Sequence, residues 1–124
     1  MPRASERPLT LNGVPDSMLA DYDQRAGATT AVSYRCTDQS AVLEPLAEIR
    51  GPPQRLLNEG SLRYHLGLIR DRQSIEPVWV YRALGAPTAT LVDGVHRWRL
   101  SLALGYAKIP CRHLTKDEAA EYGL

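Results

Sequence analysis

A histidine and two arginines gather where a helix is predicted to begin. In "LVDGVHRWRLSLALG", residues 91–105, an Asp-Gly turn follows an apolar stretch, and a second apolar run ends in glycine. A helix N-terminus already carries partial positive charge, so cations there are unfavourable unless an anion lies among them. Its unpaired N–H groups bind phosphate, and arginine adds a planar fork of donors. The predicted anion site comprises Asp93, Gly94, Val95, His96, Arg97 and Arg99.

These side chains have distinct expected roles. Gly94 allows a tight turn and a close approach of the ligand to the backbone. His96 and Arg97 neutralise the phosphate, Arg99 makes a secondary contact, and Asp93 either caps the helix or binds Mg²⁺. A purely structural interpretation stays open here, in which His96 bonds a backbone carbonyl and the arginines pair with surface acids. If phosphate binds, loss of Arg97 should weaken binding and leave the fold stable.

The elements that would position this site follow from the apolar spacing. Leu62, Leu66 and Ile69 recur at i, i+4 and i+7, which is typical of a surface helix. "IEPVWVYR" and "ATLV" have strand composition and flank the turn "LGAPT", which predicts a hairpin over 78–92. The expected helices cover 58–70 and 95–104, and the expected strands of one sheet cover 78–82, 89–92 and 109–113.

Capping residues mark the ends of these elements. Asn58 is a fair N-cap, Gly105 suits the position after a helix C-cap, and Thr115 with Glu118 forms a capping box for a short terminal helix. Trp98 continues the buried stripe of its helix. The whole pattern predicts an α+β fold with a small mixed β-sheet and flanking helices.

The first third of the chain carries weaker signals. Residues 1–40 are predicted to be an N-terminal arm or extension, and 41–124 the folded domain. Within this third, "PDSMLADYDQRAG" favours a short helix, and "TTAVSYRC" and "SAVLEPLAEI" favour strands. "RGPPQR" is a break, because proline does not fit inside a helix or a central strand.

Composition excludes several function classes. Among 124 residues, 15 Lys+Arg balance 14 Asp+Glu to a net charge of +1, so no strongly basic field favours DNA. The two cysteines, Cys36 and Cys111, lack the spacing of a zinc site or a disulfide framework. No apolar run is long enough for a membrane span or a signal peptide, which predicts a cytoplasmic protein with no membrane partner.

The motif and its flanks resemble the ParB/sulfiredoxin superfamily. "LVDGVHRWRLSLALGYAKIP", with "LEPLAEI" and "SLRYHLGLIRDRQSIEPVWVYR" upstream, is similar in order to the ParB N-terminal domain over roughly Ala41–Leu114. The resemblance implies a ParB/sulfiredoxin-like fold that binds a nucleotide (ATP, ADP or CTP), with Mg²⁺ as a candidate cofactor. It also implies that Arg72 and Gln73, before the "IEP" strand, lie beside the nucleotide.

Val95 is where this chain departs from the family. Sulfiredoxins carry a catalytic cysteine at this position, so we do not expect this chain to reduce a sulfinylated peroxiredoxin. Chromosome-segregation ParB proteins carry a glutamate there that helps to hold magnesium, which leaves Asp93 as the only nearby acid. Cys111, on the last predicted strand, is expected to be a buried structural thiol.

Three functions fit these observations. The first is a nucleotide- or phosphate-binding ParB-like domain, associated with DNA or a plasmid. The second is a nucleotide-dependent phosphotransferase similar to free-serine kinases, whose D-G-H motif resembles Asp93-Gly94 and whose glutamate base would have to be Glu44 or Glu48. The third is a non-catalytic DNA-associated accessory protein or a ParB-like nuclease. A homo-oligomer fits each of them.

Overall fold

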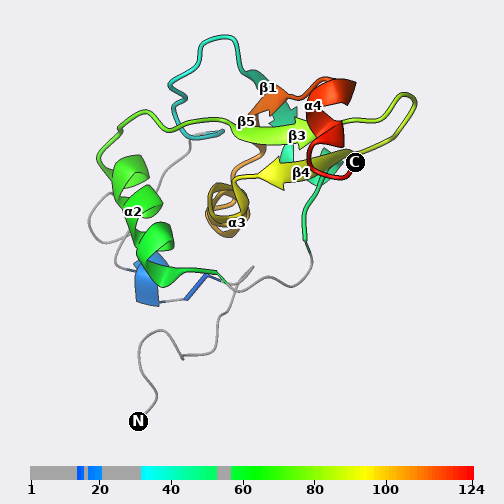
Figure 1. The fold of residues 1–124 in the computed structure, drawn as a ribbon. Coiled ribbons are helices and arrows are strands. Elements are labelled where there is room, and N and C mark those ends of the chain that lie inside the picture. The colour runs from blue at the N-terminus through cyan, green and yellow to red at the C-terminus, as the bar shows by residue number, and fades with distance from the viewer. Residues whose placement is uncertain (1–13, 16, 21–31, 53–56) are drawn as a thin grey trace.

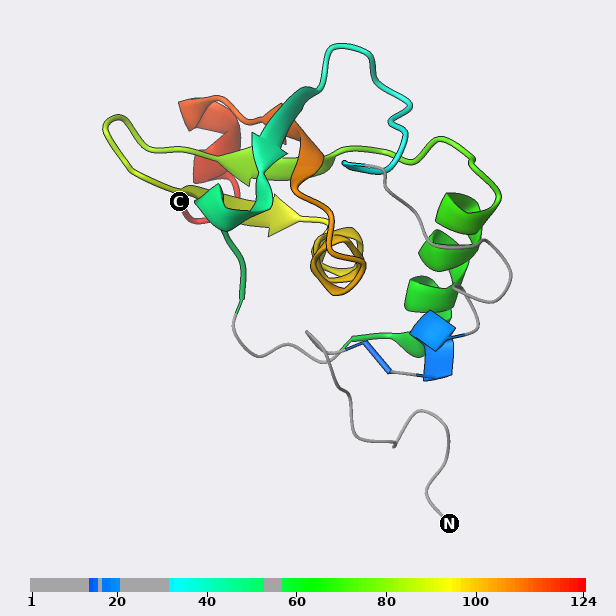
Figure 2. The same cartoon turned by 180° about the vertical axis from the view of Figure 1, so that it is seen from behind.

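The computed structural model describes residues 14–15, 17–20, 32–52 and 57–124. Figure 1 shows a curled sheet with α3 on one side and α4 on the other, and Figure 2 shows the same arrangement from behind. The elements in chain order are β1 (Val42–Pro45), the 3-10 helix η2 (Leu46–Glu48), β2 (Ile49–Arg50), α2 (Glu59–Arg70), β3 (Val78–Tyr81), β4 (Ala89–Asp93), α3 (Val95–Ala103), β5 (Lys108–His113) and α4 (Lys116–Ala120). The predicted α+β class with a small mixed sheet is confirmed.

The sheet has five strands in the order β1-β5-β3-β4-β2. β3 and β4 form the predicted antiparallel hairpin, and β5 lies parallel to β3 on its other side. β2 lies parallel to β4, with Ile49 opposite Ala89 and Arg50 opposite Thr90. Because β2 and β4 run in the same direction, the segments that follow them leave from the same end of the sheet.

The predicted elements of the second half are confirmed, with ends that shift by one residue. The Asn58 Oδ1 atom accepts from the Ser61 N–H at 2.8 Å, as an N-cap does. Thr115 and Glu118 form the predicted capping box in front of α4. Gly105 has φ 78° after α3, a left-handed conformation that glycine adopts without strain.

The predicted strand "SAVLEPLAEI" is wrong as a single element. β1 pairs with β5 at one edge of the sheet, whereas β2 pairs with β4 at the other edge. The three residues of η2 connect these two edge strands, which the curl of the sheet allows, and Leu46 of η2 is buried. In the described part of "TTAVSYRC", the strand is replaced by an isolated bridge between Cys36 and Ile75.

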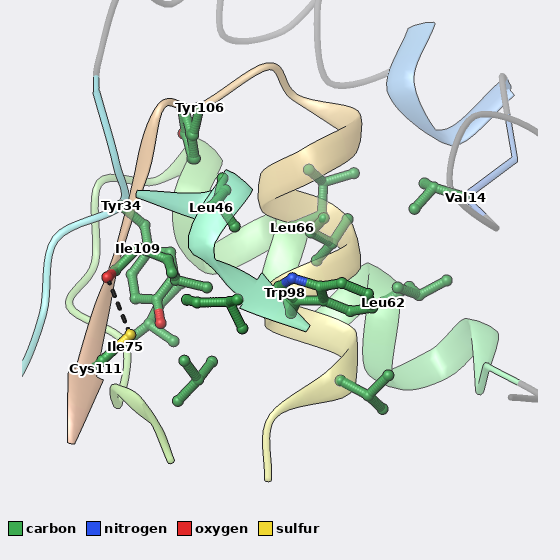
Figure 3. Close-up of a cluster of buried hydrophobic side chains, with 14 of the residues drawn as sticks. Val14, Tyr34, Leu46, Leu62, Leu66, Ile75, Trp98, Tyr106, Ile109 and Cys111 are labelled. Atoms are coloured by element: carbon green, nitrogen blue, oxygen red, sulfur yellow. Dashed lines mark hydrogen bonds between the residues drawn. The ribbon is translucent and has the colours of Figure 1, made fainter. Parts of the chain in front are cut away.

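Among the described residues, an apolar cluster fills the space between the sheet, α3 and α2 (Figure 3). Val78, Val80 and Ile109 of the sheet are fully buried in it. Cys111 is buried as expected, its thiol donates to the Ile109 carbonyl, and burial raises the pKa of this thiol to about 12. Trp98 of α3 belongs to the same cluster, which confirms its predicted place in the core.

The described parts of residues 1–40 contribute to this core. Residues 17–20 are helical, and the rest of the predicted helix from Asp21 lies outside the described residues. Val14, Met18 and Tyr34 are buried. The domain boundary predicted at 40 stays a prediction. Within the described residues, none of the helices combines the length and apolar character needed to cross a membrane.

We expect the fold to lose stability between pH 7.5 and pH 5.5 because of His65. Burial lowers the pKa of the ring and outweighs the opposing effect of its Nδ1 atom, which lies 2.8 Å from the Ser61 carbonyl oxygen. A histidine whose pKa is lower in the folded state opposes folding once the unfolded chain is protonated, below about pH 6.5. Urea unfolding at both pH values should show a smaller difference for His65→Gln than for the parent protein. An equal difference would contradict this prediction.

Candidate functional site

A groove of about 480 Å³ lies beside the start of α3. β2 ends opposite Thr90, while β4 continues to Asp93, so no described strand covers the outer edge of β4 beyond Thr90. The groove occupies this place, beyond the carboxyl end of β2 and along the uncovered edge of β4. The described residues that line it are Arg50, Gly51, Pro52, Thr90, Leu91, Val92, Asp93 and Val95.

Gly94 makes the turn from β4 into α3, as the sequence predicts. Its φ of 104° lies in the left-handed region, and it serves as the N-cap of α3. A Cβ at this position would lie 2.7 Å from the Val78 Cγ1 atom. Both the backbone conformation and the approach of β3 therefore require glycine here.

The first turn of α3 brings backbone donors to the groove. The first bond inside the helix runs from the Trp98 N–H to the Gly94 carbonyl oxygen, at 2.9 Å. The N–H groups that precede Trp98 in the helix have no intrahelical acceptor, and the N-cap residue Gly94 has no side chain to bond them. Val95 is 5% exposed and lines the groove. This end of the groove thus offers partial positive charge but no reactive side chain at Val95.

The groove contains one basic side chain that the sequence analysis missed. Arg50 is exposed at the end of β2 and lines the groove, whereas "RGPPQR" was interpreted only as a break. Its relation to Asp93 depends on the parallel pairing of β2 with β4. The available signal was a glycine and two prolines directly after a short strand with an arginine at its end.

His96 lies against α2. Its Nε2 atom accepts a hydrogen bond from the Asn58 N–H at 2.9 Å. Because an accepting nitrogen carries no proton, the ring is neutral in this arrangement. His96 therefore ties the N-cap of α2 to the first turn of α3, and a direct phosphate contact by His96 stays a prediction.

Arg97 forms hydrogen bonds with the segment that leads into β3. Its Nη1 atom donates to the Glu76 carbonyl at 3.0 Å and to the Pro77 carbonyl at 3.2 Å, and its Nη2 atom lies 3.8 Å from the Asp93 carboxylate. The side chain is 12% exposed. Because two carbonyls next to β3 accept from its guanidinium, we expect Arg97 to contribute to the stability of the fold, whereas its sequence position suggested that the fold would not depend on it.

The other predicted site residues also make contacts within the protein, Arg99 through its side chain and Arg72 and Gln73 through their backbone. The Arg99 Nη2 atom donates to the Pro52 carbonyl at 2.9 Å. Arg72 and Gln73 follow α2, where the Arg72 carbonyl accepts from Arg35 and the Gln73 N–H donates to the Leu68 carbonyl. Neither Arg72 nor Gln73 is among the described lining residues, and their contact with a nucleotide stays a prediction.

Asp93 is the one acid among the described residues that line the groove, and its side chain is 62% exposed. Glu44, on β1, instead accepts a hydrogen bond from the His113 ring at 3.1 Å, and its carboxylate lies 4.0 Å from the Arg82 guanidinium. Among the described residues, no group of three or more His, Cys, Asp or Glu side chains could hold a metal ion. Mg²⁺ would fit at Asp93 only with phosphate oxygens as further ligands, since it commonly binds one or two carboxylates plus phosphate.

Solved structures share this arrangement of strands and helices. Sulfiredoxin from Arabidopsis thaliana superposes with a TM-score of 0.54 at 24% identity, over 67% of this chain and 96% of that one. The chain has the ParB/sulfiredoxin-like fold. The C-terminally truncated ParB from Caulobacter crescentus in complex with CTP-γ-S gives a TM-score of 0.50 at 23% identity, over 68% of this chain. A free serine kinase in complex with AMP gives 0.51 at 21% identity, over 69% of this chain.

The ParB/sulfiredoxin-like fold accounts for different shares of these proteins. This chain covers nearly all of sulfiredoxin, 50% of the ParB chain and 34% of the free serine kinase. No family model matches the sequence, and no curated protein matches it. At these identities the likeness establishes the fold and leaves the activity to be inferred from the site.

Proposed function

We propose that this chain binds the phosphate groups of a nucleotide, or of another phosphorylated small molecule, in the groove at the start of α3. The observation that carries this proposal is the place of the groove, beyond the carboxyl end of β2, along the uncovered edge of β4 and beside a helix N-terminus. In open α/β sheets, ligands likewise bind in crevices beyond the carboxyl ends of parallel strands. The volume lies in the range of about 300–1,000 Å³ that is typical of small-molecule sites.

The donor, basic and acidic groups of the groove would each make a different contact with the ligand. The first-turn N–H groups of α3 would donate to phosphate oxygens, and Gly94 lets the backbone approach them closely. Arg50 would neutralise the phosphate with its guanidinium. Asp93 would hold Mg²⁺ against the same oxygens, because one carboxylate with phosphate ligands is a common magnesium environment.

Two proteins of the same fold support a nucleotide as the ligand. The ParB structure holds CTP-γ-S, and free serine kinase structures hold AMP and ADP. We therefore take ATP, ADP and CTP as the nucleotides to test, and we propose binding rather than phosphate transfer. Of the two acids considered as a kinase base, Glu44 bonds His113 outside the groove, and Glu48 is not among the described lining residues. DNA association and a homo-oligomer stay predictions.

Replacing Arg50 with alanine tests this proposal. One charge-assisted contact contributes about 1.5–3 kcal/mol, so we expect nucleotide affinity to fall by a factor of about 10–150. Calorimetric titration with ATP, ADP and CTP, with and without Mg²⁺, measures the effect. Thermal unfolding should change little, because the Arg50 side chain is exposed.

The matched control is Arg63→Ala. Arg63 is exposed on α2, where it pairs with Glu59 one helical turn earlier, and it should not alter nucleotide affinity. If the parent protein binds none of the three nucleotides, or if Arg50→Ala binds as tightly as the parent, the proposed function is wrong.

A further inference from the structure

One wall of the groove is held by α3 rather than by the sheet. β2 ends at Arg50, so Gly51 and Pro52 lie beyond its pairing with β4. Gly51 lies directly against the six-membered ring of Trp98: a Cβ at this position would come within 2.4 Å of two ring carbons and 2.7 Å of a third. Any side chain larger than hydrogen would push the indole and the wall apart.

Arg99 connects the same indole to the next residue of the wall. Its guanidinium carbon lies 4.6 Å from the centroid of the Trp98 ring, and its Nη2 atom donates to the Pro52 carbonyl. A cation over an indole face is attracted by the ring, so the contact with Trp98 orients the fork toward Pro52. One side chain thus joins α3 to the loop that leaves β2.

The Trp98 ring is positioned by packing. Trp98 is 7% exposed, and its Nε1–H group has no hydrogen-bond partner among the residues that the structure describes. Trp98 and Arg99 follow Val95 by three and four residues, so all three share one side of α3. Val95 lines the groove, and this side of the helix therefore faces both the groove and its Gly51–Pro52 wall.

We infer that Trp98 and Arg99 are positioning residues for the phosphate groove, an inference that rests on the proposed function. They hold Gly51 and Pro52 at a set distance from the first turn of α3 and thereby set the width of the groove. Arg99 acts through the Pro52 carbonyl, in place of the direct phosphate contact that its sequence position predicts. Any movement of this wall would therefore weaken the contacts of a phosphate bound between Arg50 and the α3 amides.

The experiment follows the packing of Trp98 through the fluorescence emission of its own indole ring. The chain has two tryptophans, so Trp79→Phe leaves Trp98 as the only indole. In this background, Arg99→Met removes the cation and the donor to Pro52, and Gly51→Ala displaces the ring without changing any charge. We expect both variants to shift the Trp98 emission of the ligand-free protein and to weaken binding of CTP with Mg²⁺ about tenfold, since loss of positioning is costly.

Arg99→Lys serves as the rescue variant. Lysine keeps a cation over the ring and a donor within reach of the Pro52 carbonyl, so emission and affinity should lie close to those of the parent. Arg63→Met is the control for a lost surface charge and should change neither measurement. Thermal unfolding of each variant shows that it is folded, and Arg99→Met keeps the test valid if Gly51→Ala does not fold.

The two proposals fail in different ways. If the parent binds CTP but emission and affinity are unchanged in Arg99→Met and Gly51→Ala, the positioning inference is wrong and the proposed function stands. If affinity falls in Arg99→Met alone, with emission unchanged in both variants, Arg99 contacts the phosphate directly and the inference is also wrong. If the parent binds no nucleotide, the proposed function is overturned, and the binding role of the wall falls with it.

Discussion

Replacing Gly94 with alanine is expected to lower the free energy of unfolding by about 2–5 kcal/mol, as the sum of backbone strain and a steric clash. The strain arises because φ is 104°, where a residue with a Cβ is unfavourable. The clash arises because the new Cβ would lie 2.7 Å from the Val78 Cγ1 atom in the middle of the sheet. Urea unfolding followed by far-UV circular dichroism measures the loss.

Gly105→Ala separates these two contributions. Gly105 also has a positive φ, of 78°, but a Cβ at this position would meet no heavy atom within 4 Å. We expect this control to lower the free energy of unfolding by the backbone strain alone, about 1 kcal/mol. Equal losses for the two variants would show that the approach of Val78 to Gly94 is not tight, and the account of the turn given above would be wrong.

The second large effect is expected from Arg97→Met. Methionine keeps much of the apolar stem but loses the donors to the Glu76 and Pro77 carbonyls. Each hydrogen bond from a charged group contributes about 1.5–3 kcal/mol, and sharing one guanidinium nitrogen reduces the sum. In this variant the Glu76 carbonyl still accepts a hydrogen bond from the Tyr34 hydroxyl, at 3.1 Å. We therefore expect the free energy of unfolding to fall by about 2–4 kcal/mol, measured by urea unfolding.

Arg63→Met is the matched control, because Arg63 makes an exposed pair with Glu59 on α2. Such pairs contribute about 0.3–0.5 kcal/mol, so this variant should unfold almost as the parent does. If Arg97→Met were as stable as Arg63→Met, the bonds to Glu76 and Pro77 would contribute nothing, and Arg97 would again be available to act only on a ligand.

The sequence alone determined the elements whose signals are local. The spacing of Leu62, Leu66 and Ile69, the Asn58 cap and the glycine after α3 all act within a turn or two of the helix that they define. The hairpin over 78–92 and the turn at Gly94 are of the same kind. These segments carry their own periodicity and stop signals, so their types and approximate ends were predicted correctly.

Only the tertiary structure decided where these elements meet. The connection from β1 to β2 through η2 depends on which strands pair, and no local pattern in "SAVLEPLAEI" specifies that β5 is the partner at one end and β4 at the other. The position of Arg50 in the groove also depends on which strands pair. Its neighbours there, Thr90 and Asp93, are 40 and 43 residues further along the chain, so only the parallel pairing brings them together.

The partners of the motif side chains were also decided by the tertiary structure. The types and spacing of His96, Arg97 and Arg99 predicted cations at a helix start, and the helix does begin there. An arginine, however, reaches several ångströms from its backbone, and the acceptors within that reach come from other elements. Glu76 and Pro52 provide them across 21 and 47 residues of chain. A one-dimensional pattern states what a side chain can donate, whereas the packing of distant segments determines which acceptor receives it.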